Sequence, residues 1–594
     1  PNEKHGFNFL ITGAPQFHDQ NFTKSISSYL ENGLRYNNNW GTYKGQYLTE
    51  RRNFYHKPVA NLNWDWTISE KSNLSTVLYA SWGNGGGTGN LGNRIRTEDG
   101  RIDYDAIYAQ NAVVTDGAGV NFGSEPAYIT RSSMNLHSWY GLITNYETKI
   151  TDELSWNVGF DLRTYYGKHF RVASNLHGLN SFTDNIRLRD QNNDHQTYGS
   201  FGTYKFATAT EIFKPSGWEA AFASYPLDQK IGYNNEERIS YGGLFTQLEY
   251  ANDNLSAFFQ GSVSNQYHQR FDYYQYADQS LIDGTSSQST GVALPAGITP
   301  GTDSEKVDNF GYNAKAGFSY KASEAHAFYV NTGYYNRQPY HDNIYLNFTN
   351  QVNPLTENEK IFGLEAGYGF KSSIFSANLN LYRTSWKDRV VSSSNIVDDV
   401  VQFTTNFGTE QLHSGVELDF KLRPATDLSF NGFLSVGDWQ YKGEAVQQIT
   451  DENRNVISFE NEDFDGGKVG GAAQLSGGLG VVYKISQKFS VDSDWRYYDN
   501  LYSDVGAVKE NLKLPSFNLL DAGVTFKVPL GVDKLKQLKI RGNINNVFDT
   551  EYLSSLTTAN FAEAGDETYD GIAVSNQGYF GWGRTWNVTL RYEF

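Results

Sequence analysis

The sequence predicts an all-β fold, a transmembrane antiparallel β-barrel, and three observations support this. Apolar and polar residues alternate with a period of two in many segments, which is the pattern of a strand with two different faces. Short and long connections alternate along the chain. No stretch approaches the ~20 consecutive apolar residues of a membrane-spanning helix, and the mean hydropathy is −0.56.

The alternation is clearest in segments 154–163, 375–383, 519–528 and 585–594. In the last of these, every second residue from Trp586 to Phe594 is apolar and those between are polar. We interpret the apolar face of each strand as the one that contacts lipid, and the polar face as the lining of a lumen.

The connections give the number of strands. Short polar turns are expected near 69–73, 151–153, 251–254, 322–325, 371–374, 423–427, 485–488 and 528–537, and long connections near 15–55, 84–134, 169–236, 272–306, 340–354, 389–408, 441–467, 502–515 and 549–581. Eight short and nine long connections predict eighteen strands, most of them 12–16 residues long. One rim with short turns and one with long loops is typical of outer-membrane barrels.

Aromatic residues near the predicted strand ends fit the girdles that such barrels place at the membrane surfaces. We expect six tryptophans to serve there: Trp64, Trp66, Trp82, Trp139, Trp386 and Trp586.

The composition excludes several classes of protein. The chain has no Cys, so it has neither a disulfide framework nor a thiolate metal site. Its net charge of −17 is the opposite of the balance expected in a nucleic-acid-binding protein. No nucleophile elbow or zincin motif is present, so we expect no catalytic residue and no enzyme activity.

The segment "NINNVFDTEY", Asn543 to Tyr552, resembles the C-terminal signature of TonB-dependent outer-membrane receptors, in particular those of Bacteroidota. Asn546, Phe548, Asp549 and Tyr552 carry this match. "GAPQFHDQ" from Gly13 and "LYRTSWKDR" from Leu381 are also similar to that family, and the likeness spans nearly the whole chain. The terminal strand, with Trp586, Tyr592 and Phe594, resembles the signal by which outer-membrane barrels are recognised for assembly.

The resemblance implies a location in the bacterial outer membrane and a 22-stranded barrel that encloses a plug, a size known for plugged transporters. Residues 1–594 then form a single barrel domain of eighteen strands, with four strands, the plug and the segment that contacts TonB expected upstream. It also implies active import of a scarce solute, powered through the TonB complex, with no cofactor. The Phe548–Asp549 form of the signature favours siderophore-like or other small chelates.

Two other functions stay open. An eighteen-stranded barrel can be a passive porin. Alternatively, the barrel belongs to an envelope complex whose loops dock a surface lipoprotein, as in receptors that import glycans or peptides.

Two aromatic clusters are candidate ligand contacts, because exposed aromatic rings with polar neighbours suit stacking on sugars or planar chelates. One comprises Tyr273, Tyr274 and Tyr276, and the other Tyr334, Tyr335, Arg337 and Tyr340. Anchoring at the membrane rim is the alternative role for both.

Two further motifs lie in predicted loops. The glycine-rich segment Gly83 to Asn90 lacks the Lys and the following helix of a phosphate-binding loop, so we expect a flexible outer loop. Asn461, Asp463 and Asp465 have the spacing of half a calcium loop, but Ala472 stands where its bidentate Glu would be. Calcium binding there is left open.

Overall fold

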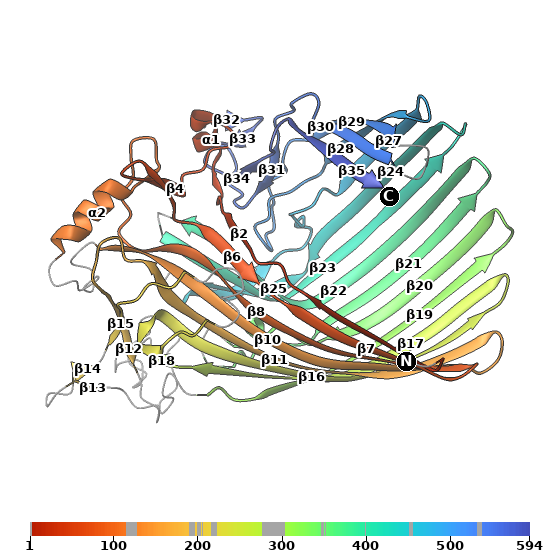
Figure 1. The fold of residues 1–594 in the computed structure, drawn as a ribbon, viewed down its shortest axis with the longest axis horizontal. Coiled ribbons are helices and arrows are strands. Elements are labelled where there is room, and N and C mark those ends of the chain that lie inside the picture. The colour runs from red at the N-terminus through yellow and green to blue at the C-terminus, as the bar shows by residue number, and fades with distance from the viewer. Residues whose placement is uncertain are drawn as a thin grey trace.

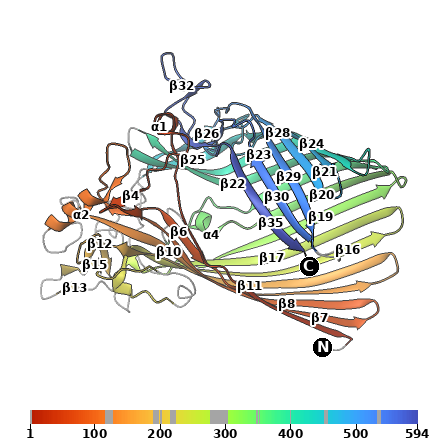
Figure 2. The ribbon, with the colours of Figure 1, turned by 45° about the horizontal axis from the view of Figure 1, so that its top comes forward.

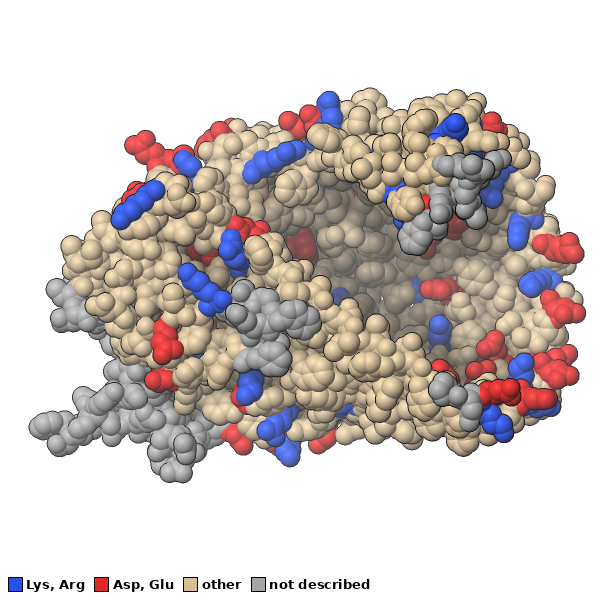
Figure 3. Space-filling view, viewed as in Figure 1, with Lys and Arg blue, Asp and Glu red and all other residues tan. Residues whose placement is uncertain are grey.

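The computed structural model is a long antiparallel sheet that curves around a wide hollow (Figures 1 and 3). It describes residues 3–114, 127–188, 197–198, 203–204, 206–214, 223–275, 303–345, 350, 352–397, 400–450, 456–530 and 537–593. The main sheet has 22 hydrogen-bonded segments, and four of them extend or branch from others, which leaves 22 − 4 = 18 strands in the wall. The predicted number of strands is confirmed.

Each wall strand pairs with its neighbour in chain order. The wall strands are β1 (His5–Thr12), β7 (Val59–Ser69), β8 (Ser72–Gly92), β10 (Tyr128–Lys149), β11 (Leu154–Asn175), β16 (Lys230–Ala251), β17 (Leu255–Asp272), β19 (Val307–Lys321), β20 (His326–Arg337), β21 (Glu359–Lys371), β22 (Phe375–Val397), β23 (Val400–Leu422), β24 (Leu428–Lys442), β27 (Leu475–Lys484), β28 (Phe489–Asp499), β29 (Phe517–Pro529), β30 (Gln537–Asn545) and β35 (Thr585–Glu593). We call the end with the long connections the outer end.

The other elements lie at the outer end. β2 (Gln16–Asp19) and β6 (Arg52–His56) continue β1 and β7, and the hairpin of β25 (Glu444–Thr450) and β26 (Val456–Asp463) pairs with β23. The remaining short elements are β3 (Lys24–Ser25), α1 (Ile26–Asn32), β4 (Trp40–Tyr43), β5 (Gln46–Thr49), β9 (Ile102–Asp103), α2 (Tyr104–Val113), β12 (Phe182–Leu188), β13 (Thr197–Tyr198), β14 (Thr203–Tyr204), β15 (Phe206–Ala209), η3 (Leu227–Gln229), β18 (Tyr274–Gln275), α4 (His341–Ile344), β31 (Leu553–Leu556), β32 (Thr568–Tyr569), β33 (Ile572–Ala573) and β34 (Gln577–Phe580). No helix among the described residues is long and apolar enough to cross a membrane.

The register separates the two faces of the wall. Leu142 of β10 lies opposite Leu78 of β8 and Leu162 of β11, and the side chains of Leu78 and Leu162 are about half exposed on the outward face. The next pair along, Ile143 and Asp161, points to the lumen. The alternation therefore continues across neighbouring strands, as a lipid-facing barrel requires.

The strands are longer than predicted. Six of them have 21–23 residues: β8, β10, β11, β16, β22 and β23. A membrane span needs only ~9–11 residues per strand, so these strands continue beyond the membrane. The predicted bounds of the long connections 84–134 and 389–408 were wrong, because β8, β10, β22 and β23 extend into these segments. The extensions have no continuous apolar face, so the alternation of the sequence does not mark them.

The glycine-rich segment Gly83 to Asn90 is part of β8, so the prediction of a flexible loop was wrong. A Cβ atom at Gly85 would lie 2.7 Å from the carbonyl oxygen of Phe54, and one at Gly86 would lie 2.6 Å from that of Ser133. The glycines are needed because neighbouring backbone approaches closely, which is a common reason for glycine within a strand.

The predicted location at the membrane surface was wrong for two of the six tryptophans. Trp139 lies against Tyr165 on the lumenal face, with ring centroids 4.8 Å apart, and Trp386 donates a lumenal hydrogen bond to Glu359. Trp82 and Trp586 are exposed on the outward face, at 40% and 76%. A tryptophan near a strand end can face either side, and only its position in the period-two alternation decides which.

The outer loops connect the two ends of the wall. β3 pairs with β34, and Arg35 donates a 2.6 Å hydrogen bond to the carbonyl oxygen of Trp582. α1 contributes Ile26 and Tyr29 to a buried cluster of loop residues. Below this contact, β1 pairs only with β7 and β35 only with β30 among the described residues, so each has one free edge in the wall (Figure 1).

Candidate ligand-binding site at the outer end of the lumen

Three arginines converge on the lumenal face where β6, β8, β10 and β11 reach the outer end. A Cβ atom at Gly89 would lie 2.9 Å from the guanidinium carbon of Arg131 and would also meet the guanidinium of Arg51. Glycine at this position leaves room for both side chains. Arg171 lies beside them on β11, 4.9 Å from the ring centroid of Tyr233. Burial and the charges of Arg171 and Arg51 lower the pKa of Arg131 to about 10.

The nearby carboxylate, Glu50, offsets only part of the charge of this arginine cluster. Glu50 is fully buried and accepts two hydrogen bonds from Arg94, at 2.8 and 2.6 Å. It also lies 3.3 Å from Nε of Arg51. Among the described residues, no carboxylate is within ion-pair distance of Arg131 or Arg171. Arg131 and Arg171 are partly buried, and their Nε atoms have no hydrogen-bond partner. Since removing a cation from water is costly without a partner, this part of the lumen is suited to an anion.

A second cationic group lies on β20, β21 and β22. Arg389 stacks on the Trp386 ring at 4.0 Å, and Arg337 lies 4.6 Å from the ring of Tyr340. Glu359 pairs with Arg337 at 3.0 Å and accepts a hydrogen bond from Trp386. Arg389 has no carboxylate within ion-pair distance among the described residues, and its Nε atom is buried without a hydrogen-bond partner.

Arg389 also lines a polar cavity of about 420 Å³. The other walls come from Gln411 and Tyr441 on β23 and β24 and from loop residues that include Asp504 and Thr557. Because Trp386 and Gln411 lie opposite each other in the register, this cavity opens from the lumenal side of the wall. The guanidinium of Arg389, the phenol ring of Tyr441 and the amide and hydroxyl groups of the lining can together bind an anionic ligand with planar groups.

Buried histidines attach the loop that carries α4 to the lumenal wall, and Figure 2 shows α4 within the curve of the sheet. His341 of α4 approaches His268 of β17, with the two Nδ1 atoms 3.2 Å apart, and its Nε2 atom lies 3.3 Å from Glu237 of β16. Glu237 also accepts hydrogen bonds from Tyr165 at 2.8 Å and from His169 at 3.0 Å. Among the described residues, no three His, Asp or Glu side chains are arranged to hold a metal ion. The hydrogen bond between His341 and His268 and the approach of His341 to Glu237 attach the loop to the wall.

The structure separates the predicted ligand residues. Tyr335 and Arg337 face the lumen, whereas Tyr334 faces outward and stacks on Tyr312 with centroids 6.0 Å apart. Tyr340 is 62% exposed beside Arg337. Adjacent residues on a strand point to opposite sides, so Tyr334 and Tyr335 cannot share one site.

The other predicted cluster is at the outer end of β17. Tyr273 donates a 3.0 Å hydrogen bond to Glu236, which lies on the outward face of β16. Tyr274 belongs to β18, and Tyr276 lies outside the described residues.

The acidic residues considered for calcium binding have basic partners, since Asp463 pairs with Lys509 and Asp465 with Lys442.

The C-terminal motif forms the turn that ends β30. Asn546 adopts a φ of +53°, and its side chain both donates to and accepts from the backbone of Thr550, at 2.9 and 2.8 Å. Asp549 accepts a hydrogen bond from the backbone N–H of Arg584, and Tyr552 stacks on Phe517 at 4.1 Å. Phe548 is 67% exposed. The motif residues therefore shape the outer end of the last hairpin.

A family model described as TonB dependent receptor-like, beta-barrel, matches residues 7–547. The chain belongs to the TonB-dependent receptor family. This barrel accordingly resides in the bacterial outer membrane and is part of a transporter that depends on TonB, not of an enzyme.

Solved structures show the same fold. The ferric-catecholate import receptor Fiu from E. coli K12, in its closed form, has a TM-score of 0.57 at 12% identity, and the match covers 100% of this chain and 72% of Fiu. The ferric yersiniabactin uptake receptor FyuA from Yersinia pestis has a TM-score of 0.61 at 10% identity, covering 100% and 68%. The copper transporter OprC has a TM-score of 0.54 at 11% identity, covering 100% and 77%.

Sequence reasoning missed most of the lumenal site. No motif pointed to Arg51 or Arg131, Arg389 lay within the family-like segment from Leu381 but was not singled out, and Trp386 was assigned to the membrane surface. The alternation within 375–386 could have placed Trp386 on the face of Asn378 and Asn380, since all three are an even number of residues apart.

Proposed function

We propose that this receptor imports an anionic metal chelate with planar groups, such as a ferric siderophore. The observation that supports this most directly is the presence of Arg131, Arg171 and Arg389 at the outer end of the lumen with no described carboxylate partner. The chain as a whole carries a net charge of −17, so these cations are a local departure from its overall charge. A ligand with negative charge would replace the missing counterions.

Binding of ferric chelates of different charge to the purified receptor tests this proposal. A ferric tris-catecholate is the anionic probe, and a ferric trihydroxamate of similar size is the neutral one. We expect the anionic chelate to bind and Arg389→Gln to weaken it about tenfold, the loss expected for one charge-assisted hydrogen bond. Arg238→Gln is the matched control, because Arg238 faces outward beside Tyr166. Equal affinity for both chelates, or equal loss in both variants, would contradict the proposal.

We also propose that four further strands and a plug complete the barrel, and that residues 1–594 are its remaining part. The free edges of β1 and β35, their exposed apolar side chains and the 68–77% coverage of the three solved structures support this. The intact mass of the protein extracted from its own outer membrane tests it. A mass well above 66.9 kDa is expected, and a mass of 66.9 kDa would contradict it.

The two other functions predict different measurements. A passive porin would give steady ion conductance in a planar bilayer, whereas a plugged receptor stays closed. A receptor that docks a surface lipoprotein would co-purify with it.

We propose that Trp586, Tyr592 and Phe594 form the assembly signal and that the Asn543–Tyr552 motif is that of the Bacteroidota subgroup. The exposed outward positions of Trp586 and Tyr592 support the first statement, and Phe594 lies outside the described residues.

A further inference from the structure

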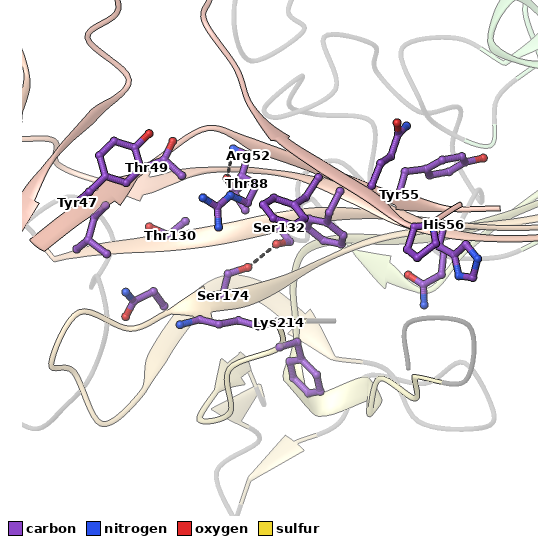
Figure 4. A pocket seen from close by; sticks show the side chains of 18 of the residues that line it. Tyr47, Thr49, Arg52, Tyr55, His56, Thr88, Thr130, Ser132, Ser174 and Lys214 are labelled. Atoms are coloured by element: carbon purple, nitrogen blue, oxygen red, sulfur yellow. Dashed lines mark hydrogen bonds between the residues drawn. The ribbon is translucent and has the colours of Figure 1, made fainter. Parts of the chain in front are cut away.

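A cavity of about 540 Å³ lies where β6, β8 and β10 reach the outer end, and Figure 4 shows the side chains that line it. Phe54 of β6, Asn84 of β8 and Ser132 of β10 line it from the wall, and Phe213 and Lys214 line it from the connection that follows β15. The register that makes Leu78 and Leu142 outward-facing also makes Asn84 and Ser132 outward-facing, because each pair is an even number of residues apart. None of Arg51, Arg131, Arg171 and Arg389 lines it, so this cavity is separate from the lumenal site.

The cavity begins just above the level of an outward-facing aromatic pair. Trp82 donates a 3.0 Å hydrogen bond from Nε1 to the hydroxyl of Tyr140, and the two side chains are 40% and 45% exposed. Aromatic residues with one polar end mark the membrane surface in such barrels. Asn84 is the first lining residue of β8 and follows Trp82 by two positions. The cavity thus lies at the headgroup level of the outer leaflet.

The lining combines aromatic rings with positive charge. Phe17, Phe54 and Phe213 are its phenylalanines, and neither Asp nor Glu is among the lining residues. Arg52 lines the cavity and donates a 2.7 Å hydrogen bond to Asp19 just outside it. Lys214, on the loop side, is exposed and has no carboxylate within ion-pair distance among the described residues.

We propose that this cavity binds an anionic amphiphile of the outer leaflet. An apolar chain would lie among the three phenylalanines. The anionic headgroup would contact the ammonium group of Lys214 and the guanidinium group of Arg52. The volume is within the ~300–1,000 Å³ typical of ligand pockets. The position supports a membrane amphiphile, because a molecule from the leaflet reaches the outward face without entering the lumen.

Photo-cross-linking of the full chain in mixed micelles tests this assignment. The probe is a phosphatidylglycerol with a diazirine at the end of one acyl chain, and cross-linked peptides are mapped by mass spectrometry. We expect labelling of 52–56 and 211–214 in addition to the membrane band. Lys214→Gln should reduce labelling of these two segments about tenfold, as expected for loss of a charge-assisted contact. Lys168→Gln is the matched control, because Lys168 faces outward at a similar level, pairs with Glu236 and does not line the cavity.

Competition with unlabelled compounds distinguishes a lipid headgroup from a soluble anion as the ligand. Unlabelled phosphatidylglycerol should suppress the labelling, and diacylglycerol with the same chains should suppress it at least several-fold less. Suppression by inorganic phosphate alone would assign the cavity to a soluble anion and overturn the proposal. Labelling confined to the membrane band, or an equal effect of Lys168→Gln and Lys214→Gln, would also overturn it.

Discussion

Lowering the pH from 7.5 to 5 should loosen the attachment of the α4 loop to the lumenal wall. His268 is fully buried under His341, and burial lowers the pKa of His268 to about 3. Burial also lowers the pKa of His341. A histidine freed into water titrates near ~6.5, so the released loop binds protons that the docked loop cannot. The docked state is therefore fully stable above that pH and loses stability as the pH falls toward 3.

The magnitude follows from the difference in pKa. For His268 alone, the shift from ~6.5 to the folded value costs the docked state about 2 kcal/mol at pH 5, or roughly thirtyfold in the docking equilibrium. Glu237 does not reverse this sign. Burial alone would raise its pKa, but the hydrogen bonds from His169 and Tyr165 and the charge of His341 lower it to about 2. Its carboxylate stays ionised in this range. Arg270 and Asp342 are the other charged groups near His341.

Hydrogen exchange of the full chain in detergent measures the effect. The amide of Asn353 donates a 2.6 Å hydrogen bond to Ile344, and that of Asn343 donates to Tyr340, so both report on the docked loop. After correction for intrinsic exchange, their protection should fall about thirtyfold between pH 7.5 and 5. The sheet of β31 and β34 is the internal control, because it holds no histidine.

Substitution of the buried histidine separates titration from general destabilisation. His268→Gln keeps a hydrogen-bonding side chain but does not titrate, so it should remove much of the pH dependence. Unchanged protection across this pH range, or the same pH slope in His268→Gln, would refute the reasoning.

Two further predictions concern the stability of the wall and its outer loops. Gly85→Ala should lower the melting temperature, because the new Cβ would collide with the ring of Tyr55. Gly87→Ala is the control and should be nearly neutral, because nothing lies within 4 Å of its Cβ position. Equal melting temperatures of the two variants would contradict the argument that Gly85 is needed for close approach of the neighbouring chain. Arg94→Met should cost about 3–5 kcal/mol in urea unfolding, because it leaves the fully buried Glu50 without its main partner. Adding Glu50→Gln should restore part of that loss, and no recovery would show that packing of the arginine matters more than its charge.

The strand pattern could be read directly because it is local. Residues two apart share a face, so the alternation in 154–163 and 585–594 was sufficient to predict strands with one apolar face. The same rule would have separated Tyr334 from Tyr335. The glycines of β8 were misread because glycine is equally compatible with a mobile loop and with close packing, and only the neighbouring strand distinguishes the two.

By itself, the sequence determined the fold class, the eighteen strands and the alternation of short turns and long loops, because each depends on hydrophobic period and turn residues within a few positions. The tertiary structure alone decided which charges meet. Arg51 and Arg131 are 80 residues apart and become neighbours only through the pairing of β6, β8 and β10. His268 and His341 meet only because the α4 loop folds into the lumen. Such contacts depend on the order and curvature of the wall, and no local pattern encodes them.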